Sequence, residues 1–541
     1  MPRGYDAGHM KRSVVIVIIL IAAAASGAAQ RGAARFDEIR TVPEKTDFKE
    51  TSHYADVVSF MEAIDKASDR VHLMTFGATT EKRTLPLAVV GAAAATPAAV
   101  KRTGKLRVYI QGNIHGGEVE GKESAQMLLR DLAAGRHDDW LLSMVFLIAP
   151  IYNADGNERF ALNNRGPQYG PLGGQGQRPN AQGFDLNRDH MKLESPEARA
   201  FVRLMNEYDP QVALDLHTTN GTRHAYHLTY SPPLHPGTDP GIVGLLRKEW
   251  FPAVTRAVRD KYGWEYTYYG NVSGGGRRGA APAAGPRRWE TFDHRPRFNN
   301  NYIGLRNRFA LLSEAFAYLT FQDRILATNR FIDETMTFAK AHADRIRKAA
   351  DAADKQRLIG ARLPLRAEMQ NTGTIEVLMG EVADEKHPVD GHIMQLRKEV
   401  KNPETMADYS TFAGLEPERV PSAYFLPPTL TDAIERLKAH GVVLTSLTKP
   451  ATVAVEEFRI DSNTTAPNAF QNHNERTLTG AWQPADRQLP AGTLRIDLTQ
   501  PLARLAFYLI EPRSDDGLVD WNVLDAAVKD AKIYPIVRTR N

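Results

Sequence analysis

A short stretch that joins a buried strand to a helix through a glycine turn constrains the fold of this chain most strongly. Residues 106–112 are rich in the apolar and aromatic side chains that are typical of a strand. Residues 124–134 carry apolar side chains at helical spacing, so we expect a helix behind the turn. A strand that leads into a helix is the unit from which parallel sheets are built.

The same alternation continues along the first two thirds of the chain. Its periodicity predicts strands at 71–76, 85–90, 144–150, 212–217 and 309–317, and helices at 54–70, 196–208, 242–262 and 331–347. We therefore expect an α/β fold with a mostly parallel or mixed, twisted central sheet flanked by helices. In such sheets the functional side chains gather beyond the carboxyl ends of the strands.

Composition divides the chain into three parts. Lys11 and Arg12 precede an apolar run at 14–25 that small residues follow, which predicts a signal peptide over residues 1–29. The α/β pattern occupies residues 30–357. Short strands, prolines and one helix at 430–440 then predict a smaller mixed α/β C-terminal domain over residues 358–541, to which the sequence assigns no role. We expect a secreted or periplasmic protein without a stable membrane span after cleavage; the alternative is an uncleaved anchor.

Cysteine is absent from all 541 residues, which limits the chemistry of the chain. Structural disulfides, thiolate metal sites and a cysteine nucleophile are excluded together. The 68 basic and 64 acidic residues leave a net charge of only +4, so we expect no nucleic-acid partner. Any metal ion must be held by His, Asp or Glu.

The glycine turn presents one histidine and one carboxylate that can reach a single cation. His115 and Glu118 stand three residues apart, and zinc accepts this mixture of nitrogen and oxygen ligands. His217, at the end of a predicted strand, would complete a His/Glu/His set with an open position for water, which is the ligand count of a catalytic zinc site. His217 could equally bond a neighbour, and His224 and His227 compete for its role.

Three further charged residues suit the chemistry of such a site. Glu314 interrupts an apolar strand, where desolvation would raise its pKa toward that of a general base; the alternative is an exposed strand end. Arg165 and Arg188 lie in polar loops. A guanidinium can bind a carboxylate or stabilise an oxyanion, although loop arginines are normally solvated.

The order of these motifs resembles the zinc metallocarboxypeptidase (funnelin) family, and the whole chain is most similar to its larger secreted bacterial members. The similarity spans about residues 50–345 and rests on these blocks in order: His115-Gly-Gly-Glu118, Asn153-Ala-Asp-Gly156, Arg165, Asp185-Leu-Asn-Arg188, Asp215-Leu-His217 and Glu314. The resemblance implies one zinc ion, bound by His115, Glu118 and His217.

The resemblance also implies roles for the remaining residues of these blocks. Asp185 would orient His115, and Arg165 would polarise the scissile carbonyl and hold the oxyanion. Asn187 and Arg188 would bind the terminal carboxylate of the substrate, and Glu314 would be the base. The family uses a mobile tyrosine, for which Tyr302 is the nearest match, although it stands closer to Glu314 than in the digestive enzymes.

These expectations define a secreted zinc-dependent metallocarboxypeptidase. It would hydrolyse the C-terminal peptide bond of peptides or proteins through a zinc-activated water, with Glu314 as general base. A zinc amidase that acts on cell-wall peptides or N-acyl amino acids is one alternative, and a catalytically dead peptide-binding module is another. Arg306 or Arg308 in the substrate pocket would favour acidic substrates, unless these arginines form salt bridges elsewhere.

Overall fold

The computed structural model describes residues 36–219, 221–273 and 287–540. The signal peptide predicted over residues 1–29 lies outside the described residues, as do residues 274–286. No helix in the described ranges is long and apolar enough to cross a membrane.

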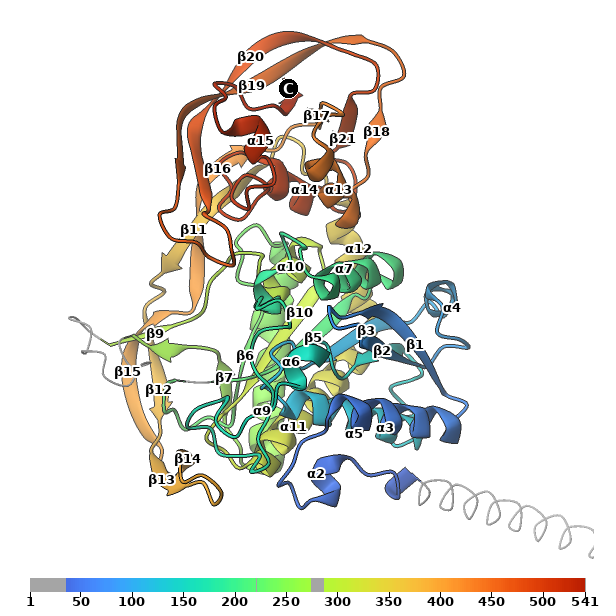
Figure 1. Ribbon diagram of the computed structural model, residues 1–541, viewed down its shortest axis with the longest axis vertical. Coiled ribbons are helices and arrows are strands. Elements are labelled where there is room, and N and C mark those ends of the chain that lie inside the picture. Colours follow the sequence, from blue (N-terminus) through green and yellow to red (C-terminus); the bar gives the residue numbers. More distant parts are fainter. Residues whose placement is uncertain (1–35, 220, 274–286, 541) are drawn as a thin grey trace, which may run out of the picture.

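An eight-stranded sheet of order β1-β2-β4-β3-β5-β10-β6-β7 forms the centre of the N-terminal region (Figure 1). Strands β4, β3, β5 and β10 run parallel to one another, and antiparallel pairings join β2 and β6 to this group. The predicted mixed α/β sheet is therefore confirmed. The strands are β1 Val71–Ala78, β2 Thr84–Val90, β3 Leu106–Gly112, β4 Met144–Ala149, β5 Val212–Thr218, β6 Leu228–Ser231, β7 Tyr266–Tyr268 and β10 Phe309–Ala315.

Helices cover both faces of this sheet because successive side chains of each strand point to opposite sides. On one face, Leu214 and Leu216 belong to a hydrophobic core shared with helices α3, α5, α9 and α11. On the other face, Ala213 packs in a second core with α7 and α10. The helices are α3 Tyr54–Ala67, α5 Glu120–Ala133, α7 Pro196–Tyr208, α9 Phe251–Tyr262, α10 Asn299–Leu305 and α11 Phe321–Ala341; shorter ones are α2 Val42–Lys45, α4 Pro97–Arg102, α6 Ala154–Asn157 and α8 Pro240–Leu245.

Several helices differ from their predicted bounds for physical reasons. Helix α5 begins at Glu120 because its polar first turn is buried: Glu123, for example, accepts hydrogen bonds from the backbone and side chain of Ser52. The predicted helix at 331–347 is two helices, α11 and α12 (Ala343–Lys355), which meet at His342. The predicted helix at 242–262 contains a π-helical turn, Leu246–Trp250, between α8 and α9.

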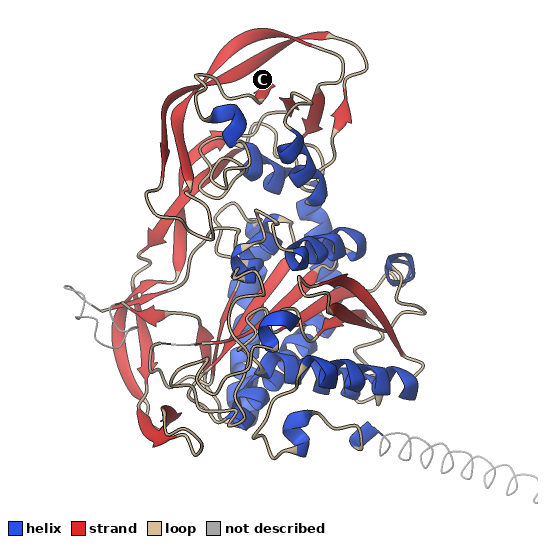
Figure 2. Ribbon diagram, in the orientation of Figure 1, coloured by secondary structure: helices blue, strands red, loops and turns tan. Residues whose placement is uncertain are grey.

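The C-terminal region is built largely from antiparallel strands around a six-stranded sheet of order β18-β21-β17-β22-β19-β20 (Figure 2). The helix predicted at 430–440 is present as α13, between strands β17 and β18, and both of these strands pair with β21. The elements of the C-terminal region are β11 Arg362–Gln370, β12 Thr374–Met379, β13 Val382–Lys386, β14 Ile393–Arg397, β15 Asn402–Tyr409, β16 Thr411–Arg419, β17 Ala423–Leu426, α13 Thr431–Ala439, β18 Thr445–Ser446, β19 Ala451–Thr465, β20 Arg476–Leu489, β21 Leu494–Asp497, α14 Ala503–Ile510, α15 Asp525–Val528 and β22 Val537–Thr539.

The two regions share both a sheet and a hydrophobic core. Strand β15 pairs in parallel with β9 (Arg288–Glu290), which pairs with β8 (Asn271–Val272), so residues on both sides of position 357 form one sheet. The core that contains Val202 of α7 also contains Leu426 of β17 and Phe507 of α14. The boundary after residue 357 stays a prediction, and it divides regions that pack closely together.

Candidate metal centre

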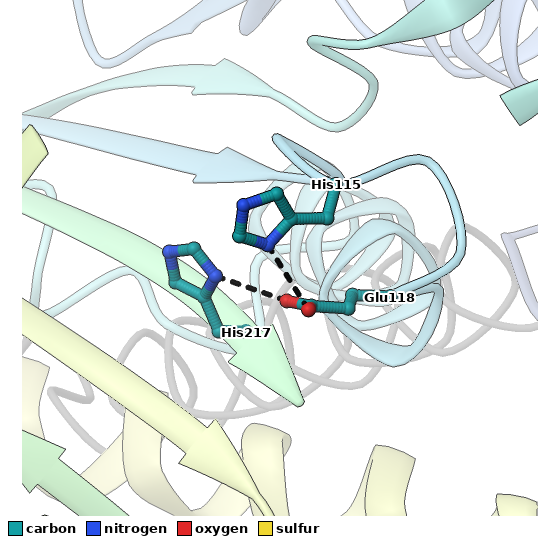
Figure 3. Close-up of side chains that lie close together, drawn as sticks. All are labelled: His115, Glu118 and His217. Carbon is teal, nitrogen blue, oxygen red and sulfur yellow. Dashed lines mark hydrogen bonds and ion pairs between the residues drawn. The ribbon is translucent and has the colours of Figure 1, made fainter. Parts of the chain in front are cut away.

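Three buried side chains converge at the carboxyl edge of the central sheet (Figure 3). His115 Nδ1 lies 3.0 Å from Glu118 Oε1, and His217 Nδ1 lies 2.9 Å from Glu118 Oε2. The ligand atoms of the three residues all lie within 4.8 Å of one another. Strands β3 and β5 are parallel neighbours, so the turn after β3 and the end of β5 meet at the same edge of the sheet.

Close packing against neighbouring backbone explains the two glycines between the first two ligands. A Cβ on Gly116 would lie 2.3 Å from the carbonyl carbon of Gly156, and one on Gly117 would lie 2.6 Å from the oxygen of Gly176. Neither position could accept a side chain without moving the backbone. Asn113 precedes them with a positive φ of 64°, and its Nδ2 donates to the carbonyl of Gly116 at 3.1 Å.

Each histidine ring is oriented by a carboxylate on its far side. His115 Nε2 donates to Asp185 Oδ1 at 3.0 Å, and His217 Nε2 donates to Asp215 Oδ2 at 2.9 Å. Because a carboxylate only accepts, each Nε2 carries the proton and each Nδ1 faces Glu118. Two imidazole nitrogens and one carboxylate, held by such outer hydrogen bonds, are a donor set that fits zinc.

Neighbouring charges shift the pKa values of two of these buried groups, Glu118 and His217. Burial by itself would raise the pKa of Glu118, but the charges of His115 and Arg165 lower it to well below its ordinary value. Burial would likewise lower the pKa of His217, but the charge of Asp215 and the hydrogen bond between them raise it to well above its ordinary value. A cation bound between Glu118 and Nδ1 of His217 would take the place of the proton that these carboxylates stabilise.

Glu314 lies beside the third ligand on the adjacent strand. It stands directly opposite His217 in the parallel pairing of β10 with β5, and its side chain is only partly exposed. Burial and the nearby charge of Glu118 raise the pKa of Glu314 to about 8, against the lowering effect of His217. A carboxyl group with such a pKa can exchange a proton near neutral pH.

The three candidate ligands and the carboxyl group of Glu314 line a cavity of about 280 Å³. Six of the residues predicted for the site line this cavity: His115, Glu118, Asn187, Arg188, His217 and Glu314. Asp185 is not among the lining residues of this cavity, but it contacts His115, which is. The remaining lining residues are Arg178, Thr218, Thr219, Tyr269, Phe292, Phe298 and Leu312.

Two arginines approach the ligands in different ways. Arg165 Nη1 donates to Glu118 Oε1 at 3.0 Å, and its Nη2 donates to the carbonyl of Thr218 at 3.0 Å, so this predicted residue braces a ligand. Arg178, which the sequence did not single out, lines the cavity and donates from Nε to Asp185 Oδ2 at 2.9 Å. Its place in a Gly- and Gln-rich loop carries no sequence signal for this position.

Asn187 and Arg188 are held at the wall of the cavity. Asn187 lies in a short 3₁₀ helix, Leu186–Arg188. Its Oδ1 accepts from the backbone N–H of Asn299 at 2.8 Å, which joins this short helix to the start of α10. The guanidinium carbon of Arg188 lies 3.7 Å from the ring centroid of Phe298, so the aromatic face supports the charge.

Tyr302 does not line this cavity. It is fully buried in α10, and its hydroxyl is 2.9 Å from His440 Nδ1 in the C-terminal region. A different tyrosine, Tyr269, lines the cavity, and both burial and the charge of Glu314 raise the pKa of its hydroxyl. The sequence did not single out Tyr269, which lies just before β8.

The other competing residues of the sequence lie elsewhere. His224 and His227 are buried outside the cavity, and burial lowers the pKa of each to about 3. Arg308 forms ion pairs with Asp209 and Asp354, while Arg306 donates to the carbonyl of His440 at 2.9 Å. The salt-bridge alternative therefore holds for Arg308, and neither arginine lines the cavity.

The C-terminal region reaches the edge of the site through the β19–β20 hairpin. Gln471 and Asn472 form its turn with positive φ angles of 49° and 68°, between paired Phe470 and His473. Gln471 Oε1 accepts from the backbone N–H of Asp185 at 3.0 Å, and His473 Nε2 contacts Glu194 Oε1 at 2.8 Å. This hairpin thus braces the segment that orients His115.

Comparison with known proteins agrees with this geometry. Residues 57–270 match the zinc carboxypeptidase family. The match covers less than half of the chain. The matched segment contains His115, Glu118 and His217, which could hold a metal ion, and the chain is a hydrolase of the metallopeptidase class.

Relatives with known names resemble this chain over most of its length. Carboxypeptidase 2 of Trichophyton tonsurans is 25% identical over 462 residues, covering 80% of this chain and 76% of its own. Among solved structures, carboxypeptidase A of Helicoverpa armigera is 16% identical with a TM-score of 0.38, covering 57% of this chain and 76% of its own. A metallo-carboxypeptidase of Pseudomonas aeruginosa is 15% identical with a TM-score of 0.37, covering 54% of this chain and 68% of its own.

Proposed function

We propose that this chain is a secreted zinc carboxypeptidase that hydrolyses the C-terminal peptide bond of peptides or proteins. The observation that carries the proposal is the content of one cavity: a convergent His/Glu/His set, a carboxyl group of raised pKa and an arginine on its wall. Metal-assisted hydrolysis requires such a combination of metal ligands, a proton-transferring group and a cationic side chain. Secretion rests on the apolar N-terminal sequence alone.

His115, Glu118 and His217 would hold the zinc ion, with Asp185 and Asp215 orienting the two rings. When bound, zinc lowers the pKa of water and polarises a carbonyl oxygen. A free position next to three protein ligands is what separates catalytic from structural zinc sites. Nothing else among the described lining residues supplies a comparable donor set for this ion.

Glu314 would move the protons of the reaction. Its carboxylate takes a proton from the attacking water, and the same carboxyl group then gives that proton to the leaving amine nitrogen. The raised pKa, about 8, supports both steps, because a group that ionises near the working pH can accept and return a proton.

Arginine side chains would bind the two negatively charged parts of the reacting substrate. Arg178 lines the cavity beside the ligands and would stabilise the carbonyl oxygen as it becomes negative, while Arg165 holds Glu118 in place. Arg188 and Asn187 would bind the terminal carboxylate. Tyr269, Phe292 and Phe298 line the same cavity and would contact the side chain of the last residue.

Replacement of Arg188 tests the recognition of a free C-terminus. We expect Arg188→Met to reduce the preference for a free-acid peptide over its C-terminal amide by about 10- to 100-fold, the weight of a charge-assisted hydrogen-bonded contact of about 1.5–3 kcal/mol. The change should appear mainly in KM for the free acid. The measurement is kcat/KM for the two peptides with native chain and variant.

Arg70→Met is the matched control, because Arg70 is exposed and pairs only with exposed Asp138 among its described ion pairs. It should leave the preference unchanged. An Arg188→Met variant with native preference, or a native enzyme that cleaves acid and amide equally, contradicts the proposed exopeptidase. Preferential hydrolysis of cell-wall peptides or N-acyl amino acids in the same assay would favour the amidase instead.

A further inference from the structure

A second histidine-containing cluster lies away from the catalytic cavity, at the tip of the β13–β14 hairpin (Figure 1). His387 Nδ1, Asp390 Oδ1 and His392 Nδ1 lie within 4.8 Å of one another. Among the described residues this is the one other group that meets the geometric requirement for holding a metal ion. We propose that it binds a second divalent transition-metal ion of the zinc type, in addition to the catalytic zinc.

The hairpin turn holds the three side chains in place before any ion arrives. The backbone N–H of His387 donates to the carbonyl of His392 at 2.8 Å, and that of Gly391 donates to the carbonyl of His387 at 3.0 Å. Gly391 has a φ of 73°, which favours glycine in this tight turn. A chelate built on a closed turn loses little conformational freedom on binding.

The hydrogen bonds of His387 place one of its ring nitrogens, as an acceptor, opposite a carboxylate oxygen. Its Nε2 donates to the carbonyl of Leu172 at 3.0 Å, and its Nδ1 accepts from the backbone N–H of Val389 at 3.2 Å. The proton is therefore on Nε2. The same Nδ1 lies 3.2 Å from Asp390 Oδ1, so two acceptor atoms face each other. A cation bound to both atoms would take the place of the hydrogen bond from Val389.

This arrangement repeats the one at the catalytic site. There too each Nε2 donates to an oxygen behind the ring, and each Nδ1 faces a carboxylate oxygen. His392 adds the second imidazole, with Nδ1 2.6 Å from the same Asp390 oxygen. A proton on His392 would satisfy its own contact with Asp390 but not that of His387.

The donor set selects the class of ion. Two imidazole nitrogens and one carboxylate oxygen suit zinc and its neighbours, whereas calcium and magnesium prefer oxygen ligands throughout. His387 is almost fully buried, while Asp390 is 38% exposed, so water can complete the coordination from the solvent side. Three protein ligands from one turn imply weaker binding than the catalytic site provides.

The proposed ion would fix the hairpin against the loop that carries Arg165. Besides the contact of His387 with Leu172, Tyr169 donates to Glu385 Oε2 at 2.9 Å, and the backbone N–H of Gln395 donates to the carbonyl of Pro167 at 2.7 Å. An ion that stiffens the hairpin tip therefore supports this loop from behind.

Zinc stoichiometry of the purified full chain tests the proposal. The chain is stripped with a chelator and titrated with Zn²⁺, and bound metal is counted by native mass spectrometry and elemental analysis. We expect two zinc ions per native chain, and one in both His392→Ala and the near-isosteric Asp390→Asn. His342→Ala, which removes a partly exposed histidine outside both clusters, should keep two.

His217→Ala separates this proposal from the proposed function. It should keep one ion, bound to the hairpin, and its melting temperature should still rise when Zn²⁺ is added; Asp390→Asn combined with His217→Ala should bind none. A native chain that binds one ion, unaffected by Asp390→Asn and lost in His217→Ala, overturns the second site and leaves the proposed function standing. Stoichiometry that drops with Asp390→Asn but not with His217→Ala supports the hairpin and contradicts the catalytic assignment.

Discussion

Glu314→Gln should bind zinc as the native chain does and yet lose turnover by about 10²- to 10⁴-fold, the usual weight of a general acid–base residue. Glutamine has nearly the same size and keeps β10 in register with β5, so the ligand His217 should stay in place. An amide, however, cannot take the proton of water. The loss should appear in kcat for release of the C-terminal residue, with bound zinc measured in parallel.

Glu197→Gln provides a matched control for this experiment. Glu197 is also a buried carboxyl group, and burial raises its pKa to about 7, but it lies in the first turn of α7 and outside the cavity. This variant should keep the native turnover. If Glu314→Gln turns over at the native rate with zinc bound, or if both variants lose activity alike, Glu314 is not the base.

Arg297→Met should lower the stability of the chain by about 3–5 kcal/mol, the cost of removing one partner from a buried ion pair. Arg297 is only 2% exposed, and its Nε lies 2.8 Å from Asp516 Oδ1, while its Nη1 lies 2.7 Å from Glu475 Oε1. Burial already raises the pKa of Asp516 to about 6. Without the arginine these carboxyl groups must take up protons or remain unpaired in a desolvated site.

The measurement is the midpoint of denaturant unfolding, because a chain of this size need not unfold in a single step. Arg345→Met is the control: Arg345 pairs with Glu249 on the surface, where ion pairs contribute little, so its midpoint should not move. Arg297 precedes position 357, and its partners follow it. Equal midpoints for native chain and Arg297→Met would contradict the view that this cluster joins the two regions.

Local pattern was enough to predict the elements that carry the site. Strand β3 and helix α7 have their predicted bounds. An apolar strand, and an amphipathic helix with a proline in its first turn, can both be recognised from the local sequence alone. Helix α4 was missed because alanine-rich residues between 91 and 103 show no apolar face. The early start of α5 was missed because its first turn buries polar residues with partners distant in sequence.

Some residues of the site could likewise be predicted from local sequence, and others could not. The structure brings His115, Glu118 and His217 together, since the turn after β3 and the end of β5 meet at one edge of the sheet, and their role as metal ligands stays a prediction. Arg178 and Tyr269 could not be found in this way, because loops without a periodic pattern bring them to the cavity. Likewise, Gln471 and Asp185 are 286 residues apart, and their contact depends on how the β19–β20 hairpin packs against the segment that contains Asp185.

The most direct test of the central claim is the release of C-terminal amino acids before and after metal removal. The chain is stripped by a chelator until elemental analysis finds no zinc, assayed on a peptide with a free C-terminus, and assayed again after Zn²⁺ is added. We predict that activity disappears, returns with zinc in the native chain, and does not return in His217→Ala. Zinc-free chain that still releases the terminal residue at the native rate would contradict the proposed zinc carboxypeptidase.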